Sequence, residues 1–494
     1  AIRRQRQMCI RDRAYDDNTY LDLLKKDLNI KVVYDWVASS SDFEEKMNLC
    51  IGSNTVPELM NVNATQYRAL LKYDMIQPLD KYFDDYASDA LKSYVKSGGE
   101  ELQKCITNED GELMAIPAPN LTAGGVNEMW IRQDWLDALG LDVPRTWDEL
   151  AEVAKAFVTR DPDGNGENDT IGILGPGNSD HMNAVGGNQF GLDPLFSCFQ
   201  SYPQYWLKSE DGSVEYGSIQ PETKTALENI SKLYADGVID PETLVRSDSK
   251  EPLLAGKVGI FFGPWWCAYT FADTTLSGSA DWRAYFTPLS EDGKYYTHMA
   301  EPTTQYVVAS KDCKNPEAAF KIINYIVANE QKWVEEGVTS TEMGTGDFYP
   351  LYNTYDNADE IEKSYEALTK YLAGDISMDD VDFSTHKLLK NDMEAVTKLK
   401  KKPYDDFSLK YWNLDSDLAK TNLPRLVAIM VGDAPLVNEE YVPVYNAYNG
   451  QTETMEAKWA NLKKMEEETF AKIIMGKADI SEFDTFVKNW KNQG

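Results

Sequence analysis

Two long stretches of the chain alternate between amphipathic helical segments and short runs of β-branched and aromatic residues. In the first stretch a helix is predicted over residues 18–30, where leucines recur at helical spacing, and strands are predicted at 31–37 (KVVYDWV) and 57–62 (PELMNV). Short strands that alternate with helices are typical of α/β proteins with a parallel sheet. The sequence therefore predicts an α/β fold.

A second α/β stretch begins near Gly124. The segment EMWIRQDWLDALGL predicts a strand that runs into a helix ending at Gly140, and TWDE at 146–149 predicts a capping box that opens the next helix. Further buried strands are predicted at 258–262 (VGIFF) and 305–310 (QYVVAS). The remainder is predicted to be mostly helical, with helices near 359–373, 378–401, 414–431 and 452–475.

These two stretches predict two lobes. No flexible linker or internal repeat separates them, so the backbone is expected to cross between the lobes more than once. The N-terminal lobe is predicted to contain residues 14–124 and about 300–330. The C-terminal lobe is predicted to contain residues 125–299 and part of 331–494, which forms a helical extension.

Residues 1–13 are interpreted as a sequencing-adapter artefact. Arg3–Arg13 reads RRQRQMCIRDR, which is the translation of a common transposase sequencing adapter. The alternative is a basic tail that follows a signal peptide. We expect this segment to lack fixed tertiary contacts, and we do not interpret Cys9 as a lipidation site. The signal peptide, the lipid-attachment cysteine and the first strand are expected to lie upstream and to be missing.

The composition excludes several classes of partner. The chain has 494 residues and a formal net charge of −32, which repels nucleic acids and anionic membrane surfaces. Its six cysteines form no CxxC pair and predict neither a disulfide framework nor a zinc site. The most apolar segment, Val258–Ala272, is interrupted by Gly263 and Pro264 and is too short to span a bilayer. No nucleic acid partner and no membrane-spanning helix are therefore expected.

Five segments carry a resemblance to a known family. In order along the chain they read MWIRQDWLDALGL, VPRTWDELAEVAKAF, DPDGNGENDTIGI, LYADGVIDPET and GKVGIFFGPWW. This order resembles family 1 extracellular solute-binding proteins, and most of all the large lipoprotein type of Gram-positive carbohydrate importers. The resemblance covers residues from about 30 to 330.

The resemblance implies a two-lobed, periplasmic-binding-protein-like fold with hinge crossovers and a ligand cleft. It implies that an oligosaccharide is captured by lobe closure and delivered to the membrane permease of an ABC importer. It also implies an extracellular, cell-surface lipoprotein, expected to be a monomer and not an enzyme. Family members bind uronate-containing as well as neutral oligosaccharides, so the sugar is left open.

Two alternative functions remain at this point, a carbohydrate-active enzyme and a sugar sensor that partners a membrane kinase. The histidines His181, His298 and His386 are isolated in the sequence, and no metalloprotease, nucleophile-elbow or phosphate-loop motif occurs. A glycosidase carboxylate pair is not excluded by counting, because the chain has 81 Asp and Glu residues. Turnover of an oligosaccharide would identify the enzyme.

The segment DPDGNGENDT at 161–170 predicts a structural calcium (Ca²⁺) site. Asp161, Asp163 and Asn165 place side-chain oxygens at alternate loop positions, Glu167 offers its backbone carbonyl, and Asp169 offers a further carboxylate. Hard oxygen ligands in this order suit a hard cation. The bidentate glutamate of a full EF-hand is absent, so another group must complete the shell. The alternative is a polar turn, which Asp, Asn and Gly also favour.

Tryptophans near strand ends are the first candidates for contact with a sugar. Sugars stack their C–H faces on aromatic rings, and strand ends in open α/β folds face the ligand crevice. Trp265 and Trp266 follow a buried strand, and at least one of them is expected to face the ligand. Trp36 and Trp130 lie on predicted strands, where a core position is the alternative.

Polar residues beside two other strands are the second set of candidates. Asn61 and Asn63 follow the PELM residues of the strand predicted at 57–62, and Glu301 precedes the strand QYVVAS. Amide and carboxylate groups can bind sugar hydroxyls. For Glu301 a solvated turn is an equal alternative.

Overall fold

The structure is a computed structural model of the chain. The predictions for residues 1–13, for the first strand upstream of them and for His181 lie outside the residues that it describes. The described ranges are 18–38, 42–177, 189–209, 211–243, 245–278, 280–335, 349–351, 355–383, 386, 388–448 and 452–494.

The chain divides into two compact units. Unit 1 consists of Ala1–Asn120, Pro302–Ala358 and Ser384–Lys387. Unit 2 consists of Leu121–Glu301, Asp359–Phe383 and Leu388–Gly494. The backbone therefore passes between the units several times.

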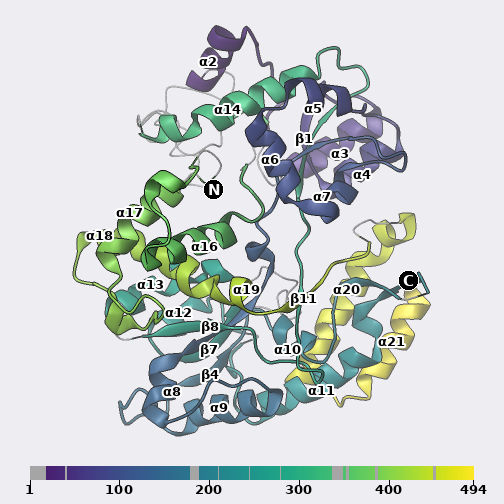
Figure 1. Ribbon diagram of the computed structural model, residues 1–494. Helices are drawn as coiled ribbons and strands as arrows, with labels where there is room; N and C mark the ends of the chain where they lie inside the picture. The colour runs from purple at the N-terminus through teal and green to yellow at the C-terminus, as the bar shows by residue number, and fades with distance from the viewer. Residues whose placement is uncertain are drawn as a thin grey trace. The chain divides into compact units, whose positions relative to one another are not determined.

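Unit 1 is built on a three-stranded antiparallel sheet (Figure 1). β1 (Leu59–Asn63) pairs with β10 (Gln305–Ala309), which also pairs with β2 (Ile116–Pro117). The pairing is not the predicted parallel one, because β10 enters from a distant segment and not through a helical crossover. The helices of this unit are α2 (Thr19–Leu28), α3 (Phe43–Ser53), α4 (Ala64–Lys72), α5 (Asp80–Tyr86), α6 (Asp89–Ser97), α7 (Gly99–Ile106) and α14 (Glu317–Glu335).

The strand predicted at 31–37 is not formed. Residues 31–38 have an irregular backbone and alternate between exposed and half-buried positions. A strand needs a hydrogen-bonded neighbour, and no described strand pairs with this segment. The strand predicted at 57–62 is confirmed as β1, which buries Met60 and Val62 in the core of unit 1.

Unit 2 contains a four-stranded mixed sheet (Figure 1). The strand order is β4 (Ile171–Leu174), β7 (Val258–Gly263), β3 (Glu128–Arg132) and β8 (Trp282–Tyr285). β4 and β7 are parallel, whereas β3 is antiparallel to both β7 and β8. Two small two-stranded sheets pair β5 (Trp206–Lys208) with β6 (Val214–Tyr216) and β9 (Tyr295–His298) with β11 (Tyr441–Val444).

The structure describes six α-helices in the first part of unit 2, and local sequence signals mark the start or end of three of them. Thr146 and Glu149 form a reciprocal capping box at the start of α9, and Gly140 ends α8 in the left-handed conformation with φ 64°. Pro221 opens α11. These helices are α8 (Gln133–Leu139), α9 (Trp147–Thr159), α10 (Asp193–Ser197), α11 (Pro221–Ala235), α12 (Lys250–Leu254) and α13 (Ala268–Leu276).

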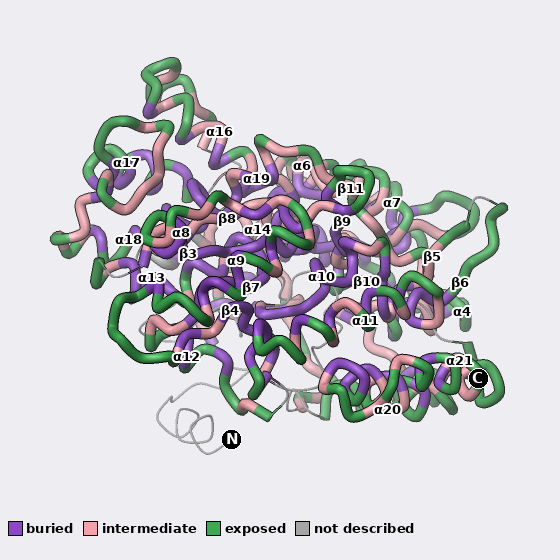
Figure 2. Tube along the Cα trace, turned by 90° about the horizontal axis from the view of Figure 1, so that it is seen from below, coloured by how far each residue is buried: buried purple, intermediate pink, exposed green. Residues whose placement is uncertain are grey.

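The C-terminal part of unit 2 is helical, as predicted. Within the helix predicted at 378–401, the α-helix is α17 (Leu389–Leu399). The segment begins instead with a single 3-10 turn, which a capping box between Ser377 and Asp380 closes. α20 and α21 each bury one face and expose the other (Figure 2). The helices are α16 (Glu360–Ala373), α17 (Leu389–Leu399), α18 (Asp417–Val427), α19 (Ala434–Asn438), α20 (Glu453–Ile474) and α21 (Glu482–Gln493).

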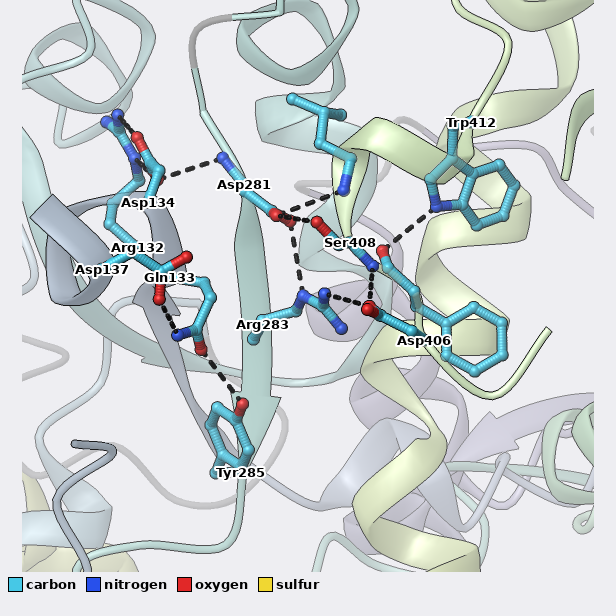
Figure 3. Close-up of polar contacts among 12 residues, drawn as sticks. Arg132, Gln133, Asp134, Asp137, Asp281, Arg283, Tyr285, Asp406, Ser408 and Trp412 are labelled. Carbon is cyan, nitrogen blue, oxygen red and sulfur yellow. Dashed lines mark hydrogen bonds and ion pairs between the residues drawn. The ribbon is translucent and has the colours of Figure 1, made fainter. Parts of the chain in front are cut away.

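A polar network attaches this C-terminal part to the edge strand β8 (Figure 3). The Asp281 carboxylate accepts hydrogen bonds from Ser408 Oγ and Leu409 N, each at 3.1 Å. Arg283 donates to Asp281 at 3.3 Å and to Asp406 at 3.2 Å. The segment after α17 is thereby held against the sheet of unit 2. Within the described ranges, no helix combines the length and the apolar run that a bilayer crossing requires.

Candidate ligand-binding site

Unit 1 contains a cavity of about 570 Å³ beside β1. Three sequence-predicted ligand residues, Trp36, Asn61 and Asn63, line it. Aromatic, aliphatic and amide groups share the lining, which is the composition expected of a small-molecule site. The other lining residues are Val33, Tyr34, Asp35, Phe43, Met47, Pro57, Leu59, Met60, Val62, Gln66, Thr304, Gln305 and Leu351.

Trp36 lies in the irregular segment before α3 and is half-buried. Its ring centroid lies 5.3 Å from that of Phe43, with the planes inclined by 52°. The ammonium of Lys46 lies 5.4 Å from the centroid of the Trp36 ring, a cation–π contact. Aromatic surface from two neighbouring segments therefore meets at one wall of the cavity.

Every residue of β1 lines the cavity, and Asn61 and Asn63 supply its amide groups. Met60 and Val62 are buried, whereas Asn61 and Asn63 are half-buried on the alternate positions. Asn61 Nδ2 donates a hydrogen bond of 3.1 Å to Oε1 of Gln305 on β10. This contact joins two amide side chains of neighbouring strands at the cavity.

Asn63 also has a structural role. Its Oδ1 accepts a 2.9 Å hydrogen bond from the backbone N–H of Gln66, and Gln66 Oε1 accepts one of 3.3 Å from the Asn63 N–H. This capping box opens α4. One asparagine therefore ends β1, begins α4 and lines the cavity.

Several lining residues were missed by sequence reasoning. Gln66 stands three positions after Asn63, so the capping-box spacing was a signal that could have found it. Gln305 is the first residue of a strand that was predicted. Its proximity to Asn61 could not be predicted, because it depends on the long-range pairing of β1 with β10, in which Asn63 lies opposite Gln305. No local pattern indicated Tyr34 or Phe43.

Trp130 is a core residue in unit 2. It is 0% exposed on the central strand β3, stacked on Phe261 at 6.2 Å and edge-on to Phe271 at 5.0 Å. Its Nε1 donates a 3.2 Å hydrogen bond to the Gly263 carbonyl. The structure thus gives Trp130 the alternative, core position, because Phe271 of α13 and the backbone at Gly432 pack against its ring.

Trp265 and Trp266 differ in burial. They share a 3-10 turn (Trp265–Cys267) directly after β7. Trp265 is 5% exposed and lies against Gly432, where a Cβ atom would stand 2.8 Å from the Trp265 carbonyl oxygen. Trp266 is half-buried and packs on the edge of the same core. Trp266 is therefore the member of the pair with an accessible ring.

Glu301 is half-buried and is the last residue of this segment of unit 2. It does not line the unit 1 cavity, whose lining in this part of the chain consists of Thr304 and Gln305. Its predicted contact with ligand stays a prediction.

The predicted calcium loop is folded around its own hydrogen bonds. Asn165 Nδ2 donates to Asp163 Oδ2 at 2.9 Å and to Asp169 Oδ1 at 3.2 Å. The backbone N–H groups of Asn165 and Gly166 donate to the Asp161 carboxylate at 3.1 and 3.0 Å. Positive φ angles at Asp161, Gly164 and Gly166 produce the tight turn.

Charge within this loop is only partly compensated. Burial and the neighbouring charges of Asp161 and Asp169 raise the pKa of Asp163. A hydrogen bond from Lys257, at 2.8 Å, lowers the pKa of Asp169. The donor types fit a hard cation, but no group of three Asp, Glu, His or Cys side chains in the described part of the chain is arranged to hold a metal ion.

Comparison with known proteins connects these observations to a family. The family described as bacterial extracellular solute-binding protein matches residues 16–333. The fructooligosaccharide ABC transporter substrate-binding protein FusA of Streptococcus pneumoniae is 30% identical over 265 residues, which are 50% of this chain and 47% of FusA. The polygalacturonan/rhamnogalacturonan-binding protein YtcQ of Bacillus subtilis is 26% identical over 246 residues, 49% of this chain and 45% of YtcQ. The matched segments thus span about half the length of each curated relative.

Solved structures show the same fold over nearly the whole chain. An extracellular solute-binding protein from Bifidobacterium longum subsp. infantis has a TM-score of 0.61 at 18% identity, covering 97% of this chain and 92% of that one. S. pneumoniae FusA in complex with kestose has a TM-score of 0.56 at 19% identity, covering 98% and 94%. An EF-hand mutant of FusA in complex with fructo-nystose has a TM-score of 0.55 at 18% identity, covering 97% and 92%. The predicted two-lobed α/β fold is confirmed by this likeness.

Proposed function

Because the chain belongs to the bacterial extracellular solute-binding proteins, we propose that it captures an oligosaccharide and delivers it to the permease of an ABC importer. The unit 1 cavity is the observation that carries this proposal. It combines half-buried aromatic surface at Trp36 with the amides of Asn61, Asn63 and Gln305. Rings that stack on sugar faces and amides that bind hydroxyls are the groups that saccharide recognition needs.

The relatives support saccharide as the ligand class but leave its charge open. FusA is named for fructooligosaccharide and YtcQ for polygalacturonan and rhamnogalacturonan. One of these ligands is uncharged and the other carries uronate groups.

Trp36→Ala tests the role of the cavity. The variant removes the aromatic wall, and loss of a stacking anchor is expected to cost about 2 kcal/mol of binding free energy, about thirtyfold in Kd. Isothermal titration with uncharged oligosaccharides, beginning with kestose, measures the change. Trp147→Ala is the matched control, because Trp147 is also half-buried but packs on Phe199 in unit 2. Equal affinity for sugar in wild type and Trp36→Ala would show that the unit 1 cavity is not the ligand-binding site.

Calcium binding to the 161–170 loop is a second part of the proposal. Asp161, Asp163, Asn165, Glu167 and Asp169 would supply the ligands, and an ion held only by such hard oxygen donors would be structural. For Asn165 to present Oδ1, its amide must release Asp163 and Asp169. Burial and the neighbouring carboxylates of Asp161 and Asp169 raise the pKa of Asp163, and a cation would compensate the charge of these three groups.

Location and partners follow from family membership as proposals. We infer an extracellular protein, attached to the cell surface as a lipoprotein, that acts as a monomer and performs no catalysis. Lobe closure on the ligand stays a prediction. Incubation of the purified protein with the bound oligosaccharide, followed by chromatography of the sugar, tests the absence of catalysis, since any cleavage product would identify an enzyme.

A further inference from the structure

We propose that the unit 1 cavity selects an uncharged oligosaccharide over a uronate-containing one, and that Gln305 is a residue that determines this specificity. The inference rests on the function proposed above and adds the chemical class of the ligand. It is drawn from the charges that the described residues place in and around the cavity.

The lining offers no cation to a carboxylate ligand. Among the described residues that line the cavity, none is Lys, Arg or His, and the one ionisable carboxyl is that of Asp35, which is exposed. An acidic sugar bound here would lose water from its carboxylates without gaining an ion pair, and Asp35 would repel it. Uncharged hydroxyls have no such cost.

The polar groups that are present suit hydroxyls. Asn61 donates to Gln305 Oε1, so the Gln305 amide nitrogen remains as a donor on an exposed side chain at the cavity. Amides both donate and accept, as hydroxyls do, and can exchange hydrogen bonds with a sugar in either direction.

The surroundings add negative charge. α3 supplies Phe43 and Met47 to the cavity and carries Glu44 and Glu45 in its first turn. The nearby ammonium of Lys46 lies over the Trp36 ring and is not part of the lining. The whole chain carries a net charge of −32, which lowers the encounter rate with polyanions.

A binding panel tests the ligand class. The probes are the uncharged trisaccharides kestose, raffinose, maltotriose and cellotriose, and the acidic trisaccharides trigalacturonate and trimannuronate, titrated calorimetrically at low and high salt. We expect at least one uncharged probe to bind about tenfold tighter than either acidic probe, with a Kd that salt leaves unchanged. An acidic probe that binds as tightly as the best uncharged one would overturn the inference and leave saccharide capture intact. Failure of every probe would instead count against saccharide capture itself.

Variants of one position test the determinant. Gln305→Lys places an ammonium at the cavity, and trigalacturonate affinity is expected to rise about tenfold. Gln305→Met has a similar length without charge and should leave trigalacturonate binding as weak as in wild type. Equal behaviour of the two variants would overturn the role of Gln305. Lys46→Met should not weaken any acidic probe; a loss there would show that Lys46 serves acidic ligands.

Discussion

Trp265→Ala should mainly lower the stability of the protein, whereas Trp266→Ala should mainly lower its affinity for sugar. Both residues lie on the same 3-10 turn, so each is a control for the other. Trp265 is 5% exposed and belongs to the apolar core of unit 2, and truncation of such a ring leaves a cavity that costs about 3–5 kcal/mol of unfolding free energy. Trp266 is half-buried, so its truncation should cost roughly 1–2 kcal/mol.

The binding effects are expected in the reverse order. The accessible ring of Trp266 is the one that a sugar can reach, and its loss should weaken affinity by about 2 kcal/mol if it stacks on the ligand. Trp265→Phe gives a finer control, because it keeps most of the buried ring and removes an indole N–H that has no hydrogen-bond partner among the described residues. That variant should be more stable than Trp265→Ala and should bind normally.

Urea unfolding and calorimetric titration of the three variants provide the comparison. The reasoning is refuted if Trp266→Ala lowers the unfolding midpoint as much as Trp265→Ala does. It is also refuted if Trp265→Ala remains as stable as wild type but loses sugar affinity, since Trp265 would then be the ligand contact. Normal affinity in both Trp265→Ala and Trp266→Ala would remove both tryptophans from the ligand site.

Two further predictions concern the calcium loop and a buried glutamate. Calcium should raise the Tm and a chelator should lower it, because an ion at a hundredfold excess over Kd stabilises the folded state by about 2.7 kcal/mol. Asp161→Ala should abolish the shift in Tm without loss of sugar affinity. An identical Tm response in Asp161→Ala would place the ion elsewhere. Glu466 is 0% exposed, and burial raises its pKa from 4.5 to about 7. The folded state therefore holds a proton that the unfolded state releases, and the unfolding free energy should fall by roughly 3 kcal/mol as pH rises from about 4.5 to 7. Glu466→Gln keeps partners for Tyr216 and Ser218 and should remove this part of the pH dependence in urea titrations; an unchanged pH dependence would contradict the assignment.

Most of the helices and strands that local signals predicted are present in the structure. The Thr146 capping box, the left-handed Gly140 and Pro221 at a helix start are fixed by the conformations of a few adjacent residues, so a short window contains the information. The prediction of a strand at 31–37 was wrong for the opposite reason. Its β-branched pattern is compatible with a strand, but a strand forms only beside a partner, and pairing is a long-range property.

The candidate site residues also divide into those that local sequence located and those that contacts between distant segments decided. Asn61 and Asn63 follow from their position at the end of a predicted strand. Trp36 was predicted on the strand at 31–37, which does not form, and it lines the cavity from an irregular segment. Trp130 and Trp265 satisfied the same rule but are core residues: Phe261, Phe271 and Gly432 lie against the Trp130 ring, and Trp265 is 5% exposed within the same apolar core. Sequence proximity to a strand end does not reveal which ring the rest of the unit will cover.

The sequence by itself determined the α/β class, the family resemblance and the loop chemistry at 161–170, since each depends on residues close together in the chain. Tertiary structure alone decided the meeting of Asn61 with Gln305, whose positions differ by 244, because strand pairing between β1 and β10 forms only after the chain has returned to unit 1. It also decided the contact of Lys257 with Asp169 at 2.8 Å, since these two residues lie far apart in the chain. Local patterns specify which conformations a segment favours, and packing between distant segments selects which side chains remain available to a ligand.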